Sequence, residues 1–156
     1  MPPQLRAWDS DAILAWLQKE DGKWQQCEGT WAAAERGTIR LVVSSLAIAE
    51  VLMLRHHDKI PKERSTKVRE FFRHSWIAVR QLDRPTAELA QDVVWDHGVN
   101  PKDAVHVATA IRAGVRRLDT FDADLIKLSG TIAGQSLVIG RPDIPMAQQL
   151  ANPASP

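Results

Sequence analysis

The 156-residue sequence lacks the features that mark secreted, membrane-spanning or zinc-binding proteins. Its single cysteine, Cys27, permits no internal disulfide, so we expect a protein of the reducing cytoplasm. No apolar run approaches the roughly 20 residues of a membrane span, and the N-terminal residues lack the basic and apolar regions of a signal peptide. No His-x-x-x-His or Cys-x-x-Cys spacing occurs. The sequence therefore predicts one domain that does not contact a membrane.

Strong charge of either sign is also missing, because the net charge is only +1. The charges are nevertheless unevenly distributed: the segment from Arg55 to Arg84 contains nine Lys or Arg and four acids, so it carries +5 and the remainder −4. A basic segment beside an acidic remainder suits an enzyme that holds a polyanion against metal ions. A solvated helix face with pairs such as Glu63–Lys67 is an equal alternative for any one of these charges.

Short predicted strands alternate with predicted helices along the chain. The expected strands are 4–8, 39–43, 116–120 and 136–139, and 76–82 is either a strand or an extended connection. The expected helices are 11–19, 24–36, one that begins at Ser44 or Ser45, 61–73, 85–97, 101–112 and 122–129. This alternation predicts an α/β fold of three layers, α/β/α, around a short parallel sheet of four to five strands. Residues 1–140 form the predicted domain, and 141–156 form an irregular, proline-containing tail.

Glu50 is the one polar side chain in the nine-residue run Leu46–Leu54. An ionised carboxylate is costly to bury unless a cation or hydrogen-bond donors compensate it. Three solutions are open: a Lys or Arg partner, a raised pKa, or a metal ion shared with other carboxylates. Asp9, Asp103 and Asp122 are candidates for sharing, because each lies where an apolar or β-type stretch meets the start of a predicted helix.

The acids outside this run also have a simpler explanation in helix capping. Asp9 and Asp122 suit N-cap positions. Asp103 lies three residues after Asn100, the spacing of a capping box. Asp124 lies in a first turn, where the helix dipole favours a carboxylate. Capping is therefore an alternative to a shared site for each of these acids taken singly.

A set of Asp and Glu side chains provides only oxygen ligands. Hard divalent cations bind oxygen, and Mg²⁺ takes a few carboxylates while it keeps several waters. The set therefore favours Mg²⁺ or Mn²⁺ over zinc. His106 lies inside a predicted helix, and we expect a core or hydrogen-bonded histidine there rather than a catalytic one.

Four segments, taken in order, resemble those of a known family. The segments are Trp8–Ser10, Ser44–Val51, Asp103–Ala110 and Leu118–Leu125. Together they resemble the PIN domain, and in particular the VapC-type toxin ribonucleases of bacterial toxin–antitoxin pairs. The resemblance spans Trp8 to about Ile139 and implies a PIN-like sandwich. It departs from the family at Asp11, where Ser or Asn is more usual, in a first strand that is less apolar than usual, and in the Trp-bearing stretch 23–36.

The resemblance implies an endoribonuclease that cleaves RNA phosphodiesters with Mg²⁺ or Mn²⁺ bound by carboxylates. By position, the four catalytic and metal-binding acids of the family correspond to Asp9, Glu50, Asp103 and Asp122, and Asp124 corresponds to an additional acid. Asp9 and Asp103 are the expected principal ligands, and the other acids complete the ring directly or through waters. Ser10 and Thr120 correspond to hydroxyl groups that hold carboxylates or waters by hydrogen bonds.

The resemblance also implies partners. We expect an RNA substrate, a homodimer and a cognate antitoxin protein that silences the site. The predicted RNA contacts come from the basic segment and are Arg55, Lys59, Lys62, Arg69 and Arg73.

Three other readings compete with the ribonuclease. The triplet Asp9-Ser10-Asp11 resembles the start of a haloacid-dehalogenase-type phosphatase, but the Gly-Asp pair of that class is absent. A receiver-type signalling domain needs an Asp at a strand end near mid-chain, where this sequence has Glu50 in a predicted helix. A PIN-fold scaffold or RNA-binding protein without cleavage is the third alternative, against which the intact set of four acids argues.

Overall fold

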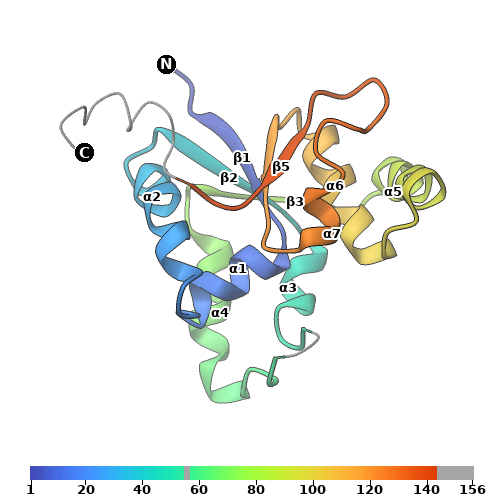
Figure 1. Cartoon of the computed structure of the whole chain (residues 1–156). Coiled ribbons are helices and arrows are strands. Elements are labelled where there is room, and N and C mark those ends of the chain that lie inside the picture. The colour runs from blue at the N-terminus through green and yellow to red at the C-terminus, as the bar shows by residue number, and fades with distance from the viewer. Residues whose placement is uncertain (55–56, 144–156) are drawn as a thin grey trace.

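The computed structural model describes residues 1–54 and 57–143, and in this part of the chain a five-stranded parallel sheet forms the centre (Figure 1). The strands are β1 (Gln4–Trp8), β2 (Ile39–Ser44), β3 (Ile77–Arg80), β4 (Arg117–Asp119) and β5 (Val138–Gly140). Their order in the sheet is β3-β2-β1-β4-β5. Ala7 of β1 pairs with Val42 on one side and with Leu118 on the other. The predicted parallel sheet is confirmed, with the segment 76–82 contributing a strand.

The helices lie close to the predicted ranges. They are α1 (Ser10–Leu17), α2 (Trp24–Glu35), α3 (Leu46–Glu50), the 3₁₀ turn η1 (Lys62–Arg64), α4 (Ser65–Arg73), α5 (Arg84–His97), α6 (Pro101–Arg112) and α7 (Ala123–Ile126). The helix predicted to open at Pro61 begins with η1 and becomes α-helical at Ser65. The helix predicted over 122–129 is shorter than expected, because only Ala123–Ile126 has α-helical hydrogen bonding.

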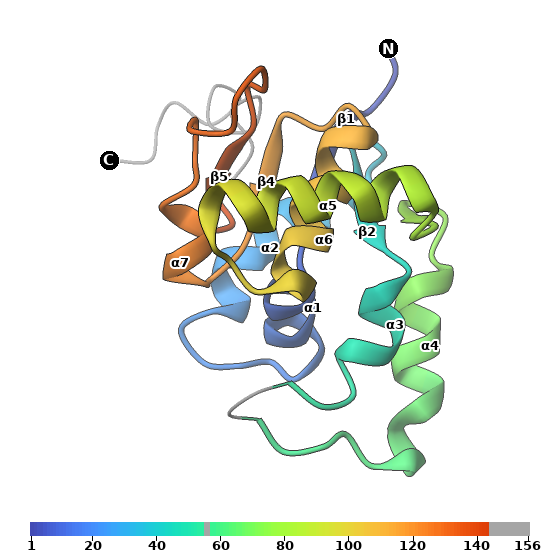
Figure 2. The same ribbon diagram turned by 90° about the vertical axis from the view of Figure 1, so that its right-hand side faces the viewer.

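Helices cover both faces of the sheet, as the three-layer prediction requires. Trp8, with Ile13 of α1 and Phe71 of α4, belongs to the core on one face. Its neighbour Ala7 belongs with Val107 of α6 to the core on the other, because successive side chains of a strand point to opposite faces. Figure 2 shows α5 and α6 lying across this second face. The α/β/α sandwich is therefore confirmed.

The chain reverses its direction across the sheet at β1. It first builds β2 and β3 on one side of β1 and then crosses to build β4 and β5 on the other. Right-handed crossovers in opposite directions place their helices on opposite faces, so the connections diverge beyond the carboxyl ends of β1 and β4. Such a reversal point is where open parallel sheets form ligand crevices. A backbone hydrogen bond of 3.3 Å from the Asp9 N–H to the Asp119 carbonyl joins the two strand ends here.

The packed structure continues past the predicted domain end at residue 140. Pro142 is buried, and the Asp143 carbonyl accepts a hydrogen bond of 2.8 Å from Thr30 Oγ1 of α2. The remainder of the predicted tail, 144–156, lies outside the described residues, as does Arg55. Within the described ranges, no helix is both long and apolar enough to cross a membrane.

Candidate active site

An open cavity of about 1000 Å³ lies beyond the carboxyl ends of β1 and β4. Its acidic lining comes from distant parts of the chain, and the structure brings the predicted acids together there. The acids that line it are Asp9, Asp11, Glu50, Asp103, Asp122 and Asp124. The predicted hydroxyl residue Ser10 and the histidine His106 line it as well. Thr120 does not line the cavity, but it contacts two of the acids that do, Asp9 and Asp122.

Asp9 follows β1 directly and is 3% exposed. Its Oδ1 accepts a hydrogen bond of 3.0 Å from the Ala12 N–H and so caps α1. Its Oδ2 accepts a short hydrogen bond from Thr120 Oγ1. Burial raises the pKa of Asp9 to about 7, with the charge of Asp11 acting in the same direction and that of His106 opposing it. The capping role and the place at the cavity wall, weighed as alternatives for this residue, are both observed.

Thr120 connects Asp9, which follows β1, with Asp122, which follows β4. While its hydroxyl donates to Asp9, its Oγ1 accepts from the Asp122 N–H at 3.0 Å. Asp122 in turn caps α7 by accepting from the Asp124 N–H at 2.9 Å. Asp124 lies at the cavity rim with its side chain 81% exposed, 3.5 Å from Lys127 Nζ.

Asp103 lies in the first turn of α6 and is half-buried. The cap of this helix is Asn100, whose side chain accepts from the Lys102 N–H at 2.9 Å. Across residues 1–54 and 57–143 the Asp103 carboxylate makes no hydrogen bond, so the capping box considered for it is not formed. Burial, with the charge of Asp122 next in importance, raises the pKa of Asp103 to about 6. This carboxylate is therefore available to a ligand.

Glu50 is the last residue of α3, and its side chain is 6% exposed. Around it in the same apolar run, Ile48, Leu52 and Met53 are exposed. The Glu50 side chain is buried with Ala47 and Val51 of the same run, because it faces α6, where its Oε1 lies 3.1 Å from His106 Nε2. Glu50 Oε2 is buried without a partner among the described residues.

The compensation of Glu50 differs from the two protein-based solutions considered from sequence. Its partner is a histidine rather than Lys or Arg, and its pKa is not raised. Burial acts to raise the pKa of Glu50, but the hydrogen bond and the positive charge of His106 outweigh it and hold the pKa below its ordinary value. Burial acts to lower the pKa of His106, but Glu50 and the charge of Asp9 together raise it. His106 is a hydrogen-bonded histidine, as predicted, although its place in the acidic cavity was not foreseen.

The acids are gathered but not closed into a metal-binding cage. Among the residues that the structure describes, no group of three His, Cys, Asp or Glu side chains stands close enough to hold a metal ion without rearrangement. Both oxygens of Asp9 already accept hydrogen bonds, whereas Asp103 and Glu50 Oε2 are free of partners in the same part of the chain. A cation here would take some of its ligands from water, as Mg²⁺ does.

Four of the five predicted RNA contacts are among the described residues, and these four lie outside the cavity. Lys59, Lys62, Arg69 and Arg73 are exposed, and none of them lines the cavity wall. Two lysines do line the cavity: Lys102, in the first turn of α6, and Lys127, which caps the end of α7. Sequence reasoning missed both, because nothing in the local pattern distinguishes them from other surface lysines.

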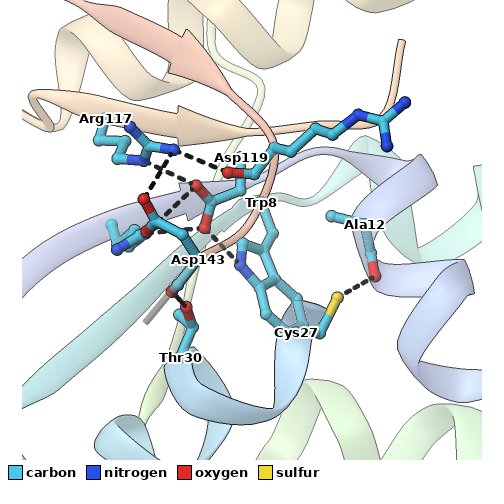
Figure 3. Close-up of polar contacts among 9 residues, drawn as sticks. Trp8, Ala12, Cys27, Thr30, Arg117, Asp119 and Asp143 are labelled. Carbon is cyan, nitrogen blue, oxygen red and sulfur yellow. Dashed lines mark hydrogen bonds and ion pairs between the residues drawn. The ribbon is translucent and has the colours of Figure 1, made fainter. Parts of the chain in front are cut away.

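A second polar cluster, also missed, is centred on Asp119, the last residue of β4 (Figure 3). The fully buried Asp119 accepts hydrogen bonds from Arg6 Nε at 2.7 Å, Trp8 Nε1 at 3.0 Å and Arg117 Nε at 3.1 Å. Arg6 also pairs with Asp143, beyond β5. The sequence signal for this cluster is the charge of Arg6 inside a predicted strand, because a strand of a covered parallel sheet seldom carries an unpaired charge.

Comparison with known proteins agrees with this architecture. The profile of the family described as "PIN domain" matches residues 8–130. A search of curated protein sequences found no significant match.

Solved structures of several bacterial proteins are similar to this chain in fold. The sarcin–ricin-loop-cleaving toxin VapC20 of Mycobacterium tuberculosis is 16% identical, with a TM-score of 0.62 over 83% of this chain and 95% of that one. A chain of VapBC2 from Rickettsia felis, bound to a promoter DNA fragment, is 15% identical, with a TM-score of 0.60 over 90% and 100%. A chain of a toxin–antitoxin complex from Klebsiella pneumoniae is 14% identical, with a TM-score of 0.57 over 85% and 95%.

Proposed function

This chain belongs to the PIN domain family, and we propose that it is a metal-dependent endoribonuclease, the toxin of a VapBC-type toxin–antitoxin pair. The observation that carries the proposal is that the acids after β1, at the end of α3 and at the starts of α6 and α7 surround one cavity. The family match favours this function over the phosphatase and receiver hypotheses. The retained acids favour cleavage over a scaffold or RNA-binding role without chemistry.

The proposed cofactor is Mg²⁺ or Mn²⁺. Three observations fit such an ion: the donors are carboxylate oxygens, Glu50 Oε2 is buried without a partner among the described residues, and crowding with burial raises the pKa of Asp9 and Asp103. A divalent cation would relieve this crowding. When bound, it would lower the pKa of a water and neutralise charge on the scissile phosphodiester. Asp103 and Asp9 are the proposed principal ligands, with Glu50, Asp122 and Asp124 completing the set directly or through waters.

The remaining residues of the site hold these carboxylates in place. Thr120 orients Asp9 by its hydroxyl group and Asp122 by the bond to its N–H. Ser10 Oγ lies 3.1 Å from His106 Nε2. Ser10 therefore contacts the same histidine that holds Glu50. We propose that both hydroxyl residues act through the acids rather than on the RNA.

RNA would approach the cavity over cationic side chains. Lys102 and Lys127 line the cavity itself and suit contacts to the phosphates next to the scissile bond. The exposed Lys59, Lys62, Arg69 and Arg73, together with Arg55, remain proposed contacts to more distant phosphates. Replacement of Lys102 should weaken RNA binding and reduce its dependence on salt concentration.

The proposed protein partners are a second copy of the chain and an antitoxin. Ile48, Leu52 and Met53 present an exposed apolar surface beside the cavity, where Met53 is part of the wall. We propose that this surface is covered in the homodimer, and that Met53→Glu shifts the chain to a monomer in light scattering. The proposed location is the cytoplasm, where the buried free Cys27 stays reduced.

The decisive experiment is cleavage of total RNA by the purified chain with Mg²⁺, with Mn²⁺ and with EDTA. Cleavage should require a divalent cation and should be lost in Asp9→Asn. Asparagine still caps a helix, so this variant should fold, which circular dichroism can verify. Asp92→Asn, an acid exposed on α5, is the matched control and should cleave like the wild type. Cation-independent cleavage, or full activity of Asp9→Asn, would refute the proposal.

A further inference from the structure

His106 joins three of the segments that build the acidic cavity. It lies on α6 one turn after Asp103, and its ring is 2% exposed. Its Nε2 is 3.1 Å from Glu50 Oε1 at the end of α3 and 3.1 Å from Ser10 Oγ at the start of α1. A single ring nitrogen therefore contacts both neighbours, and Nδ1 is buried without a partner among the described residues.

This arrangement determines which group donates and excludes a nucleophilic triad. An ionised carboxylate only accepts hydrogen bonds, so the proton of the Glu50–His106 contact lies on Nε2. A serine nucleophile needs Nε2 of its histidine free of that proton, with the acid on the opposite nitrogen. In this chain Ser10 and Glu50 share one nitrogen, so Ser10 is not activated. The histidine instead acts on the carboxylate.

The contact with His106 makes the two carboxylate oxygens of Glu50 different from each other. Oε1 is held by His106, whereas Oε2 is buried and has no partner among the described residues. Because Glu50 is the last residue of the short helix α3, the backbone around it contributes little to fixing the side chain. The hydrogen bond that fixes Glu50 Oε1 comes from His106 on α6, the helix that also carries Asp103.

We infer that His106 is a positioning residue of the site: it holds Glu50 Oε1, so that Oε2 is the one oxygen of this carboxylate presented to a cation or to the attacking water. The inference rests on the proposed ribonuclease function and adds to it a division of labour within Glu50. It also accounts for the burial of a carboxylate in an apolar run, because His106 gives Glu50 a buried partner.

Two substitutions of His106 distinguish the role of its hydrogen-bond donor from the role of the imidazole ring as a whole. Glutamine places its amide N–H₂ at about the reach of Nε2, whereas asparagine reaches only about as far as Nδ1. His106→Asn should lower kcat about 100-fold, the size of effect expected when a reacting group is misplaced by about 1 Å, with a smaller change in KM for RNA. His106→Gln should recover most of the loss. His74→Asn is the matched control: His74 stacks on Trp76 at 4.3 Å, away from the cavity, so it should affect stability and leave kcat unchanged.

A double-mutant cycle with Glu50→Gln completes the test. If His106 acts through Glu50, His106→Asn should add little to the loss already caused by Glu50→Gln. Equal losses for His106→Asn and His106→Gln, or losses that multiply in the double variant, would overturn the positioning role. A wild type that neither cleaves RNA nor binds Mg²⁺ or Mn²⁺ would overturn the proposed function itself. An active wild type whose His106→Asn variant is undiminished would overturn only this inference.

Discussion

Replacing Arg6 with methionine should lower the free energy of unfolding by about 3–5 kcal/mol, the range for a buried ion pair that loses one partner. Asp119 is fully buried, and Arg6 contributes two of its hydrogen bonds, from Nε at 2.7 Å and from Nη2 at 3.0 Å. Methionine fills much of the space but donates nothing, so Asp119 would keep only Trp8 and Arg117 as donors. The Arg6 guanidinium also pairs with Asp143, so that contact is lost too.

A matched control lies on the surface of α5. Arg84 pairs with Glu88 at 2.8 Å, close to the Arg6–Asp119 distance, but the two side chains are 89% and 59% exposed. Water screens such a pair, and it contributes about 0–1 kcal/mol. Arg84→Met should therefore cost far less than Arg6→Met. The two variants make the same chemical change and differ in burial, so the difference between their costs measures the loss of one cation from a buried carboxylate that keeps Arg117.

The assay is equilibrium unfolding in urea, followed by circular dichroism and by the combined fluorescence of the six tryptophans. The double variant Arg6→Met with Asp119→Asn removes both charges, while the amide oxygen can still accept from Trp8. Its cost should be smaller than the sum of the two single costs. If Arg6→Met costs under about 1 kcal/mol, or no more than Arg84→Met, the ion pair does not stabilise the junction of β1 and β4 as we argue.

Three further predictions concern the acids of the cavity. Asp103→Asn should raise the melting temperature measured without metal, because it relieves repulsion between carboxylates. It should also abolish the rise in melting temperature that Mg²⁺ causes in the wild type, whereas Asp92→Asn should have neither effect. A wild-type melting curve unmoved by Mg²⁺ and Mn²⁺ would contradict the metal site. Stability should fall as the pH rises from about 4 to about 7, because folding raises the pKa of Asp9 and Asp103 from 3.8 to about 7 and about 6, so the native state binds more protons. In urea titrations this slope should be shallower for Asp9→Asn than for the wild type, and equal slopes would contradict the assignment. An antitoxin that places an Arg among the acids should lose affinity for this chain as the Mg²⁺ concentration rises, because both would occupy one site. Calorimetry measures that affinity, and an affinity that does not change with Mg²⁺ would exclude a shared site.

Much of the fold was predictable because its signals are local. The apolar run of β2 and the capping residues Asp9, Asn100 and Asp122 place element boundaries within a few residues, since strand burial and helix capping depend on neighbours in sequence. The α7 boundary was less accurate. Its segment forms turns after Ile126, where tertiary packing overrides helix propensity.

The candidate site was predictable for a related reason. In a parallel sheet the residues that follow strands meet at one edge, so acids at strand ends were expected to share a crevice. Asp9 follows β1 and Asp122 follows β4, the neighbours at the reversal point. Glu50 was identified by its conflict with an apolar run, although the partner that resolves the conflict was not.

Three features follow from local sequence patterns alone: the alternation of strands and helices, the acids at the strand ends and the resemblance to a family. The partners of the buried charges, in contrast, are set by the folded chain. Arg6 meets Asp119 across 113 positions, and Glu50 meets His106 across 56. Such pairs depend on sheet register and on which helix face turns inward, and these follow from the packing of the whole chain rather than from any local pattern.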